Sequence, residues 1–367
     1  MNPYRQVISP TTVELPRAAL REMVRLMRAL YALGHLPAYR EQILPQLPQV
    51  ARFDPGHDGV MMGYDFHLTE DGPRLIEVNT NAGGGLLAYQ AQYGTKTGNN
   101  TDLDRLQRGF LTSFSEELSR HGRSGLQRVA IIDEAPQEQF LYHEMLTYAE
   151  LLQQQGIDAQ VVDPAELLAD ETGVTLQGRP VDLIYNRHCD FYLDSELMAG
   201  LRAAYLARSV CLTPNPFVYG LLADKRRMIL WSDPAALAEL GLPARESELL
   251  LRTVPQSRLL AGVDLEQIWQ KRKQLAFKPV TRFGSRGVLL GRKISRKRFD
   301  ELTPEETLVQ QLVPPSEVTA EDGQVMKADF RLFAYRNRLL GVAARLYQGQ
   351  VTNMRTPGGG YAPVRIL

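Results

Sequence analysis

Cysteine is scarce in this sequence, and so is any excess of charge of one sign. Cys189 and Cys211 are the only cysteines in 367 residues, too few for a disulfide scaffold or a cysteine-based zinc site. Lys plus Arg equals Asp plus Glu at 42 each, so no net field would attract nucleic acid or an anionic membrane. We therefore expect neither as a partner. The oligomeric state is left open.

Long hydrophobic runs are also missing. No stretch approaches the length of a membrane span, and the N-terminal residues lack the basic and then apolar pattern of a signal peptide. We therefore expect a cytoplasmic protein. The remaining composition, 44% hydrophobic and 23% charged, is ordinary for a globular chain long enough for two or three domains.

The segment that carries most information lies early in the chain. Met61–Leu68 and Arg74–Asn79 are short apolar-rich runs around a turn-rich loop, a pattern that predicts a β-hairpin with a longer connection. With the turn centred near residue 71, Asp65 falls opposite Glu77, and Asn79 shares the face of Glu77 because strand side chains alternate. Facing carboxylates repel unless a cation lies between them. Carboxylate and amide oxygens suit Mg²⁺, with Mn²⁺ as an alternative.

The simpler interpretation is an exposed hairpin whose polar face meets water. The glycine-rich segment after the hairpin favours a site instead, because Gly83–Gly85 would let a ligand approach the backbone closely.

The middle of the chain alternates strands and a helix. Residues 128–132, 159–162 and 181–185 read as strands, with a helix at about 137–155 between the first two. This rhythm predicts a βαβ unit with a parallel sheet, hence an α/β protein. No GxGxxG follows the first strand, which disfavours an NAD-dependent oxidoreductase.

Basic and glycine-rich motifs appear in the last third. Lys225 lies in an expected helix at Phe217–Trp231, and Lys278 lies on an expected strand at Leu275–Val280. The turn after this strand, Gly284-Ser285-Arg286-Gly287, can present several backbone N–H groups to one anion. Taken singly, these residues are better explained by a solvated helix face and an ordinary hairpin turn.

Two further segments resemble parts of a nucleotide site. The strand Leu308–Val313 ends in prolines, which leave backbone groups that an adenine edge can use. The run Met326–Ala334 alternates strictly and carries Arg331 on its polar face, and the returning run Leu339–Tyr347 carries Arg345 near the same register. An edge strand and a half-buried antiparallel sheet are the simpler interpretations.

Together these motifs resemble the ATP-grasp family, in particular its circularly permuted, glutathionylspermidine synthase-like members. The metal-binding hairpin comes last in the usual order of that family, whereas here it precedes the βαβ unit. The resemblance implies an ATP-grasp fold divided into residues 1–125 (helices and the permuted metal-binding part), 126–215 (the βαβ domain) and 216–367 (the ATP-binding part). It also requires the hairpin to lie in one sheet with the strands of residues 326–347, or directly against them.

The resemblance also implies roles for individual residues. The metal ligands would be Asp65, Glu77 and Asn79, and the phosphates would be bound by Lys225, Lys278 and the flap residues Gly284, Ser285, Arg286 and Gly287. The adenine and ribose would be contacted by Gln310, Gln311, Val313 and Glu317. The catalytic residues would be Arg331, Arg345 and Lys278, and Asn353, near the end of the chain, would also contact the nucleotide. One departure stands out. The family carries an arginine two residues before the aspartate, where this chain has Gly63.

The implied activity is an ATP- and Mg²⁺-dependent ligase that joins a carboxylate to an amine, both small molecules or peptides, through an acyl phosphate, releasing ADP and phosphate. The departure at Gly63 keeps a second hypothesis open. In that alternative the chain is a catalytically silent nucleotide-binding or regulatory protein on the same fold.

Overall fold

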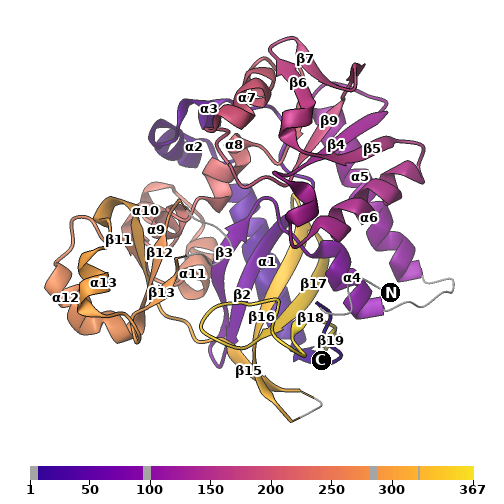
Figure 1. Cartoon of the computed structure of the whole chain (residues 1–367). Coiled ribbons are helices and arrows are strands. Elements are labelled where there is room, and N and C mark those ends of the chain that lie inside the picture. The colour runs from indigo at the N-terminus through magenta and orange to yellow at the C-terminus, as the bar shows by residue number, and fades with distance from the viewer. Residues whose placement is uncertain (1–6, 94–100, 282–286, 321–322) are drawn as a thin grey trace.

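The computed structural model describes residues 7–93, 101–281, 287–320 and 323–367 of a mixed α/β protein (Figure 1), which confirms the predicted fold class. Within these ranges, no helix combines the length and the apolarity needed to cross a membrane.

A six-stranded sheet occupies the centre. Its strand order is β18-β17-β16-β2-β3, with β15 paired to β16. The strands are β2 (Met62–Thr69), β3 (Gly72–Asn79), β15 (Ser316–Thr319), β16 (Val325–Tyr335), β17 (Arg338–Tyr347) and β18 (Gly360–Ala362). Because β2 pairs directly with β16, the early hairpin and the late strands share one sheet, as the sequence predicted.

The hairpin has a shorter turn than we predicted and a bulge that compensates for it. Thr69 pairs with Gly72, so only two residues connect the strands. A turn this short would place Asp65 opposite Ile76, but the register shifts by one residue between Asp65 and Phe66, and Asp65 pairs with Glu77. Ile76 is the extra residue of this β-bulge, so its backbone is left out of the regular ladder.

A parallel four-stranded sheet lies above the central sheet in Figure 1, with order β10-β9-β4-β5. Its strands are β4 (Arg128–Ile132), β5 (Asp158–Val162), β9 (Leu183–Asn186) and β10 (Cys211–Thr213), and its helices are α5 (Thr101–Arg120), α6 (Tyr142–Gln153) and α7 (Ala199–Leu206). A small antiparallel sheet adjoins it, formed by β6 (Leu167–Asp170), β7 (Gly173–Leu176) and β8 (Arg179–Pro180). All three strands predicted for the βαβ unit are present.

An antiparallel four-stranded sheet forms the lobe at the left of Figure 1, with order β11-β14-β12-β13. Its strands are β11 (Ser257–Leu259), β12 (Leu275–Pro279), β13 (Leu289–Leu290) and β14 (Thr307–Gln311), with α12 (Leu265–Lys271) and α13 (Arg296–Asp300). Apolar side chains of both strands and helices, among them Phe277 and Phe299, give this lobe its own small core.

The remaining helices pack against the sheets or against one another. They are α1 (Arg17–Leu33), α2 (Pro37–Ile43), α3 (Gln49–Arg52), α4 (Gly85–Tyr93), α8 (Pro216–Val218), α9 (Arg227–Trp231), α10 (Pro234–Glu239) and α11 (Ala244–Thr253). Helix α1 begins after Pro16 and ends before Gly34. Its buried face, which includes Met23 and Leu30, joins the largest hydrophobic core together with the sheet.

The continuous helix predicted over Phe217–Trp231 is wrong. After α8 the chain makes a π-helical turn at Tyr219–Ala223 and leaves the helix at Asp224. The Asp224 carboxylate accepts hydrogen bonds from the backbone N–H and the guanidinium of Arg226. Since a side chain that bonds its own neighbouring backbone competes with helix formation, the chain turns here and resumes as α9.

The glycine segment is tightly packed by the protein itself. A Cβ on Gly83 would lie 2.2 Å from Leu141, and one on Gly84 would lie 1.6 Å from the Tyr361 hydroxyl. Glu144 accepts hydrogen bonds from the N–H groups of Gly84 and Leu86 at 2.8 and 2.9 Å. The absence of side chains here thus serves internal packing, and the backbone is not laid open to a ligand in the way we expected.

This packing yields a stability prediction. Gly84→Ala should cost about 1–3 kcal/mol for overpacking beyond the cost of about 1–2 kcal/mol that any alanine incurs in a left-handed conformation. Gly122→Ala is the matched control, because Gly122 has a similar φ of +95° against +89° but no atom within 4 Å of a Cβ. The midpoint of urea unfolding should fall clearly further for Gly84→Ala. Equal midpoints would contradict the packing argument.

Candidate functional site

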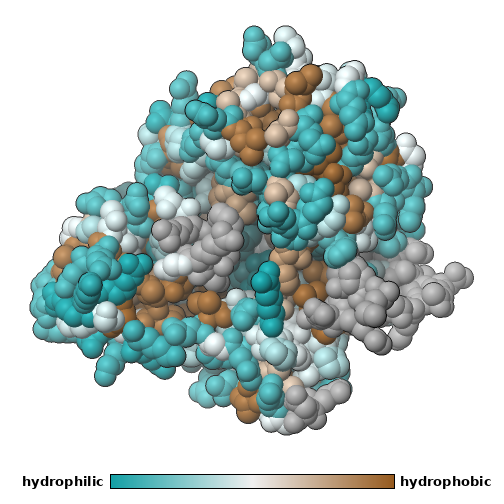
Figure 2. All heavy atoms as spheres, in the orientation of Figure 1, coloured by the Kyte–Doolittle hydropathy of each residue, from teal (hydrophilic) through white to brown (hydrophobic). Residues whose placement is uncertain are grey.

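An open cavity of about 670 Å³ lies where the left lobe faces the central sheet. Figure 2 shows the molecular surface hollowed between these parts. The cavity is lined by residues of β2, β3, β12, β14, β16 and β17 and of the segments that adjoin these strands. They are Asp65, His67, Ile76, Glu77, Ala276, Lys278, Val288, Leu290, Gln310, Gln311, Leu312, Val313, Asp329, Arg345, Tyr347, Gln350, Val351 and Thr352.

The predicted metal ligands converge on one face of the hairpin. The Asn79 amide nitrogen lies 3.5 Å from oxygens of both Asp65 and Glu77. Asp65 is already engaged, because both of its oxygens accept hydrogen bonds from guanidinium groups. Glu77 therefore fits a hard divalent cation directly, and Asn79 fits it through its amide oxygen once the amide group turns over. Asp65 fits it after giving up one of these bonds.

Asp65 belongs to a buried network of ion pairs. Arg331 holds it with two hydrogen bonds of 2.6 Å, and Arg345 bridges Asp65 at 2.8 Å and Asp329 at 2.5 Å. Burial alone would raise the pKa of Asp65, but the two guanidinium groups outweigh it and hold that pKa well below its usual range. The carboxylate is therefore charged at neutral pH.

Gly63 makes room for one member of this network. A Cβ at residue 63 would lie 3.4 Å from Cδ and Nε of Arg331, and 2.7 Å from the Ala82 Cβ. The Arg331 side chain occupies the space beside residue 63 and reaches Asp65 from the neighbouring strand. Arg331 also donates to the Gly83 carbonyl at 3.0 Å, which joins the network to the glycine segment.

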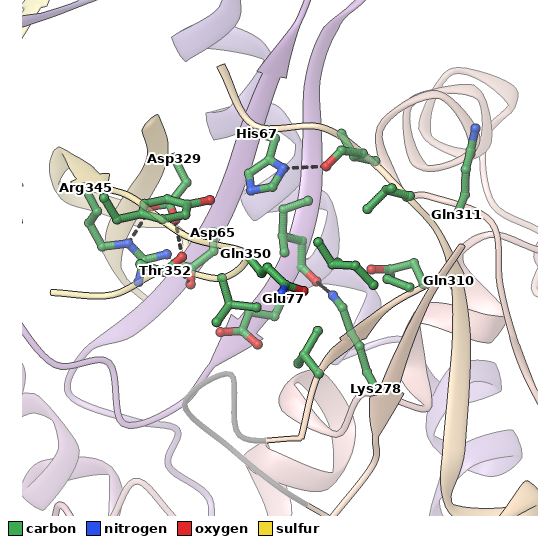
Figure 3. A pocket seen from close by; sticks show the side chains of 18 residues that line it. Asp65, His67, Glu77, Lys278, Gln310, Gln311, Asp329, Arg345, Gln350 and Thr352 are labelled. Carbon is green, nitrogen blue, oxygen red and sulfur yellow. Dashed lines mark hydrogen bonds and ion pairs between the residues drawn. The ribbon is translucent and has the colours of Figure 1, made fainter. Parts of the chain in front are cut away.

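Lys278 reaches the cavity from the opposite side, as Figure 3 shows. Its Nζ donates to the Ile76 carbonyl at 3.1 Å, so the residue extruded by the bulge supplies the acceptor. Burial lowers the pKa of Lys278 to about 8, with nearby Glu77 acting to raise it and Lys225 acting to lower it. Lys225 lies in the turn between the π-helical segment and α9, and lines a smaller pocket together with Glu77 and Lys278.

The predicted adenine segment contributes in part. Gln310, Gln311 and Val313 line the cavity. The Gln310 amide, however, donates to the Ser257 hydroxyl at 3.1 Å, and the Val313 carbonyl accepts from His67 at 2.8 Å.

Two predicted residues stand apart from this cavity. Glu317 lies in β15 opposite Lys327 and is not part of its lining. Asn353 is exposed and accepts from the Arg355 N–H within its own turn. Of the predicted phosphate flap, Gly284, Ser285 and Arg286 lie outside the described residues, and Gly287 is an exposed turn residue.

Sequence reasoning missed three residues of the site. Asp329 lies with Arg331 on the polar face of β16. The alternation of polar and apolar residues indicates this face correctly, but it does not indicate a role for Asp329. Thr352 donates to Asp329 at 2.7 Å, and His67 reaches across to Val313. Neither had a distinctive pattern, since each acts through a contact with a residue far away in the sequence.

The fold has known relatives among solved structures. No protein-family model matches the chain, and no curated protein matches it by sequence. A glutathione synthetase-like effector from Globodera pallida, solved in its apo form, matches at a TM-score of 0.63 and 11% identity, covering 98% of this chain and 90% of the other. A gamma-glutamylcysteine synthetase-like protein from Methylobacillus flagellatus matches at 0.55 and 12%, covering 95% and 88%. The chain therefore has an ATP-grasp-related fold.

The buried network yields a prediction for Asp65→Asn. Removing the carboxylate leaves Arg331 and Arg345 short of a buried counter-charge, and breaking such a pair commonly costs about 3–5 kcal/mol. Asp71→Asn, in the exposed hairpin turn, is the control and should stay within about 0.5 kcal/mol. Urea unfolding at pH 7 measures both. The stabilisation requires an ionised Asp65. It should begin to decline as the pH falls below about 4, the pKa of an unfolded aspartate, and be lost only below the lowered pKa of Asp65 in the folded protein. An unchanged midpoint for Asp65→Asn would contradict the network.

Proposed function

We propose that this chain is an ATP- and Mg²⁺-dependent ligase that joins a carboxylate to an amine and releases ADP and phosphate. One observation carries the proposal. Glu77, Lys278 and Arg345 come from two different sheets and face a single cavity whose wall includes the end of β14. Carboxylates for a metal, cations for phosphates and a strand end for a base are thereby brought together, on a fold related to ATP-grasp proteins. We also propose that the order of these elements reflects a circular permutation.

Each residue has a physical role in this proposal. Glu77 and Asn79 would hold the cation, which would shield the negative charge of the phosphates, and Asp65 would be a further ligand. Lys278 and Lys225 lie beside Glu77 and bind phosphate oxygens. Arg345 stabilises charge that develops during transfer to the carboxylate. Because such catalysis consists mainly of positioning and electrostatics, no nucleophilic side chain is required.

The two hypotheses differ in turnover. The experiment is to incubate the protein with MgATP and mixed amino acids and short peptides, and to measure ADP and phosphate. Substrate-stimulated release supports the ligase. Saturable ATP binding without any release would instead support a nucleotide-binding protein without catalysis.

The cytoplasmic location expected from the sequence stays a prediction.

The metal ligand yields the first prediction for this function. Glu77→Gln keeps the shape of the side chain but removes one negative charge, so turnover should fall by at least about 10²-fold. Glu70→Gln, in the exposed turn of the same hairpin, should leave turnover unchanged. Products are separated by anion-exchange chromatography. Formation of AMP and pyrophosphate, or a near wild-type rate for Glu77→Gln, would disprove the proposed chemistry.

The lowered pKa of Lys278 predicts that the affinity for MgATP depends on pH. Below pH 8 the side chain is a cation and attracts phosphate; above pH 8 it is neutral in the free protein, so binding must take up a proton. The dissociation constant of MgATP should therefore rise by up to about tenfold per pH unit above 8. Lys278→Arg stays charged throughout and should flatten this rise. Calorimetry from pH 7 to pH 9.5 compares the two proteins, and identical profiles would rule out the role of Lys278.

A further inference from the structure

A second group of reactive side chains lies outside the nucleotide cavity. It joins His57 from the segment before β2, His121 just after α5, and Cys211 at the start of β10. All three are buried, with 3%, 7% and 0% of their surface exposed. One ligand atom from each residue lies within 4.8 Å of the other two. None of them lines the cavity described above.

The hydrogen bonds of His57 orient its ring toward this group. Nδ1 lies 3.2 Å from a Glu117 oxygen, and the other Glu117 oxygen accepts from the Tyr335 hydroxyl at 2.9 Å. The Asn215 amide is 3.5 Å from the same Nδ1 but makes its shorter bond, 2.9 Å, to the Asp58 carbonyl. With the Nδ1 proton donated to Glu117, the lone pair of Nε2 points toward Cys211 Sγ, 3.9 Å away. A carboxylate behind a histidine is the usual way to orient a metal-binding imidazole.

His121 supplies a second, independent observation. Neither of its ring nitrogens has a hydrogen-bond partner although the side chain is buried. The Arg208 backbone lies nearby, outside normal hydrogen-bonding geometry, and the ring packs edge-on against His57 with centroids 5.4 Å apart. Burial lowers the pKa of His121 to about 4, so the ring is neutral and its lone pair is available. An unsatisfied buried polar group costs roughly 1–3 kcal/mol, which a metal bond would relieve.

The charges are also consistent with a divalent cation. Burial raises the pKa of the Cys211 thiol well above its usual range, with Glu117 adding to the effect. Without a cation the thiol therefore keeps its proton. A thiolate and the Glu117 carboxylate together would balance a charge of +2 in this enclosed place.

We propose that His57, His121 and Cys211 form a zinc site with three protein ligands, with Glu117 orienting His57 through Nδ1. Two imidazoles and one thiolate are borderline-soft ligands that suit Zn²⁺. Ligand atoms on one zinc ion lie about 3.5 Å apart, given Zn–N and Zn–S bonds of about 2.0 and 2.3 Å. His57 Nε2 and Cys211 Sγ, 3.9 Å apart, are already near this spacing, whereas the ligand atoms of the whole cluster, within 4.8 Å of one another, have to move closer. Two cysteines are too few for a site made of cysteines, but the histidines complete this one.

The site would tie together segments far apart in the chain. His57 precedes the hairpin of the central sheet, whereas Cys211 begins an edge strand of the parallel sheet, and their residue numbers differ by 154. A metal bond at this point would fix the two sheets against each other. The cluster takes no part in the proposed ligase chemistry, so its metal can be tested apart from any activity.

The test uses the full chain without a histidine tag, expressed with added zinc and dialysed. Elemental analysis should find about one zinc per chain. After removal of zinc, titration with Co²⁺ should give the ligand-field bands of a tetrahedral ion and a thiolate-to-cobalt charge-transfer band. Zinc should also raise the thermal unfolding midpoint of the zinc-free protein.

Variants assign the ligands. Cys211→Ser should abolish the charge-transfer band and lower zinc affinity by at least 100-fold, whereas Cys189→Ser, at the other cysteine, should retain both. Glu117→Gln should weaken zinc binding by about 10–100-fold. The wild-type measurements do not depend on whether a variant folds. Absence of both zinc and a cobalt band in the wild-type protein, or full retention of both in Cys211→Ser, would overturn the proposal.

Discussion

A row of four buried charges crosses the middle of the central sheet, and both the sheet and the candidate site depend on it. Arg345 joins Asp329 to Asp65, and Arg331 grips Asp65 from the neighbouring strand. Buried ion pairs contribute little net stability because desolvation offsets their attraction. Their effect here is on register. A slip of one residue in any strand would turn its charge onto the apolar face, so the network permits a single alignment of β2, β16 and β17.

Part of this sheet could be predicted from the sequence. The pairing of Asp65 with Glu77 was predicted correctly, but from an incorrect turn. The two-residue connection and the bulge at Ile76 are two departures that cancel. Alternating and apolar runs also located the longer strands of all three larger sheets, because burial on one or both faces leaves a direct imprint on residue order. The short strands β10, β11, β15 and β18 were not predicted.

Other features left no such imprint. The interruption at Asp224 depends on a side chain bonding to its neighbour, and the glycines at 83 and 84 are required by Leu141 and Tyr361, which are distant in sequence. Gly63 stands where the resemblance predicts an arginine, and in the structure Arg331 occupies the space beside it. At the three glycines the cause is a tertiary contact, which a single sequence does not encode locally. The histidines and cysteine of the second cluster were invisible for the same reason.

The two ends of the described chain are joined by a small parallel ladder. Strand β1 (Val13–Leu15) pairs with β19 (Val364–Ile366), and backbone hydrogen bonds continue on both sides, from Tyr361 to Val7 and from Arg17 to Leu367. In a parallel pair, the incoming chain enters at one end of the ladder and the outgoing chain leaves at the other. A tension applied through the two ends therefore shears all these bonds at once instead of opening them one by one. The β1–β19 ladder therefore resists a stretching force at the two ends of the described chain, where such a force acts first.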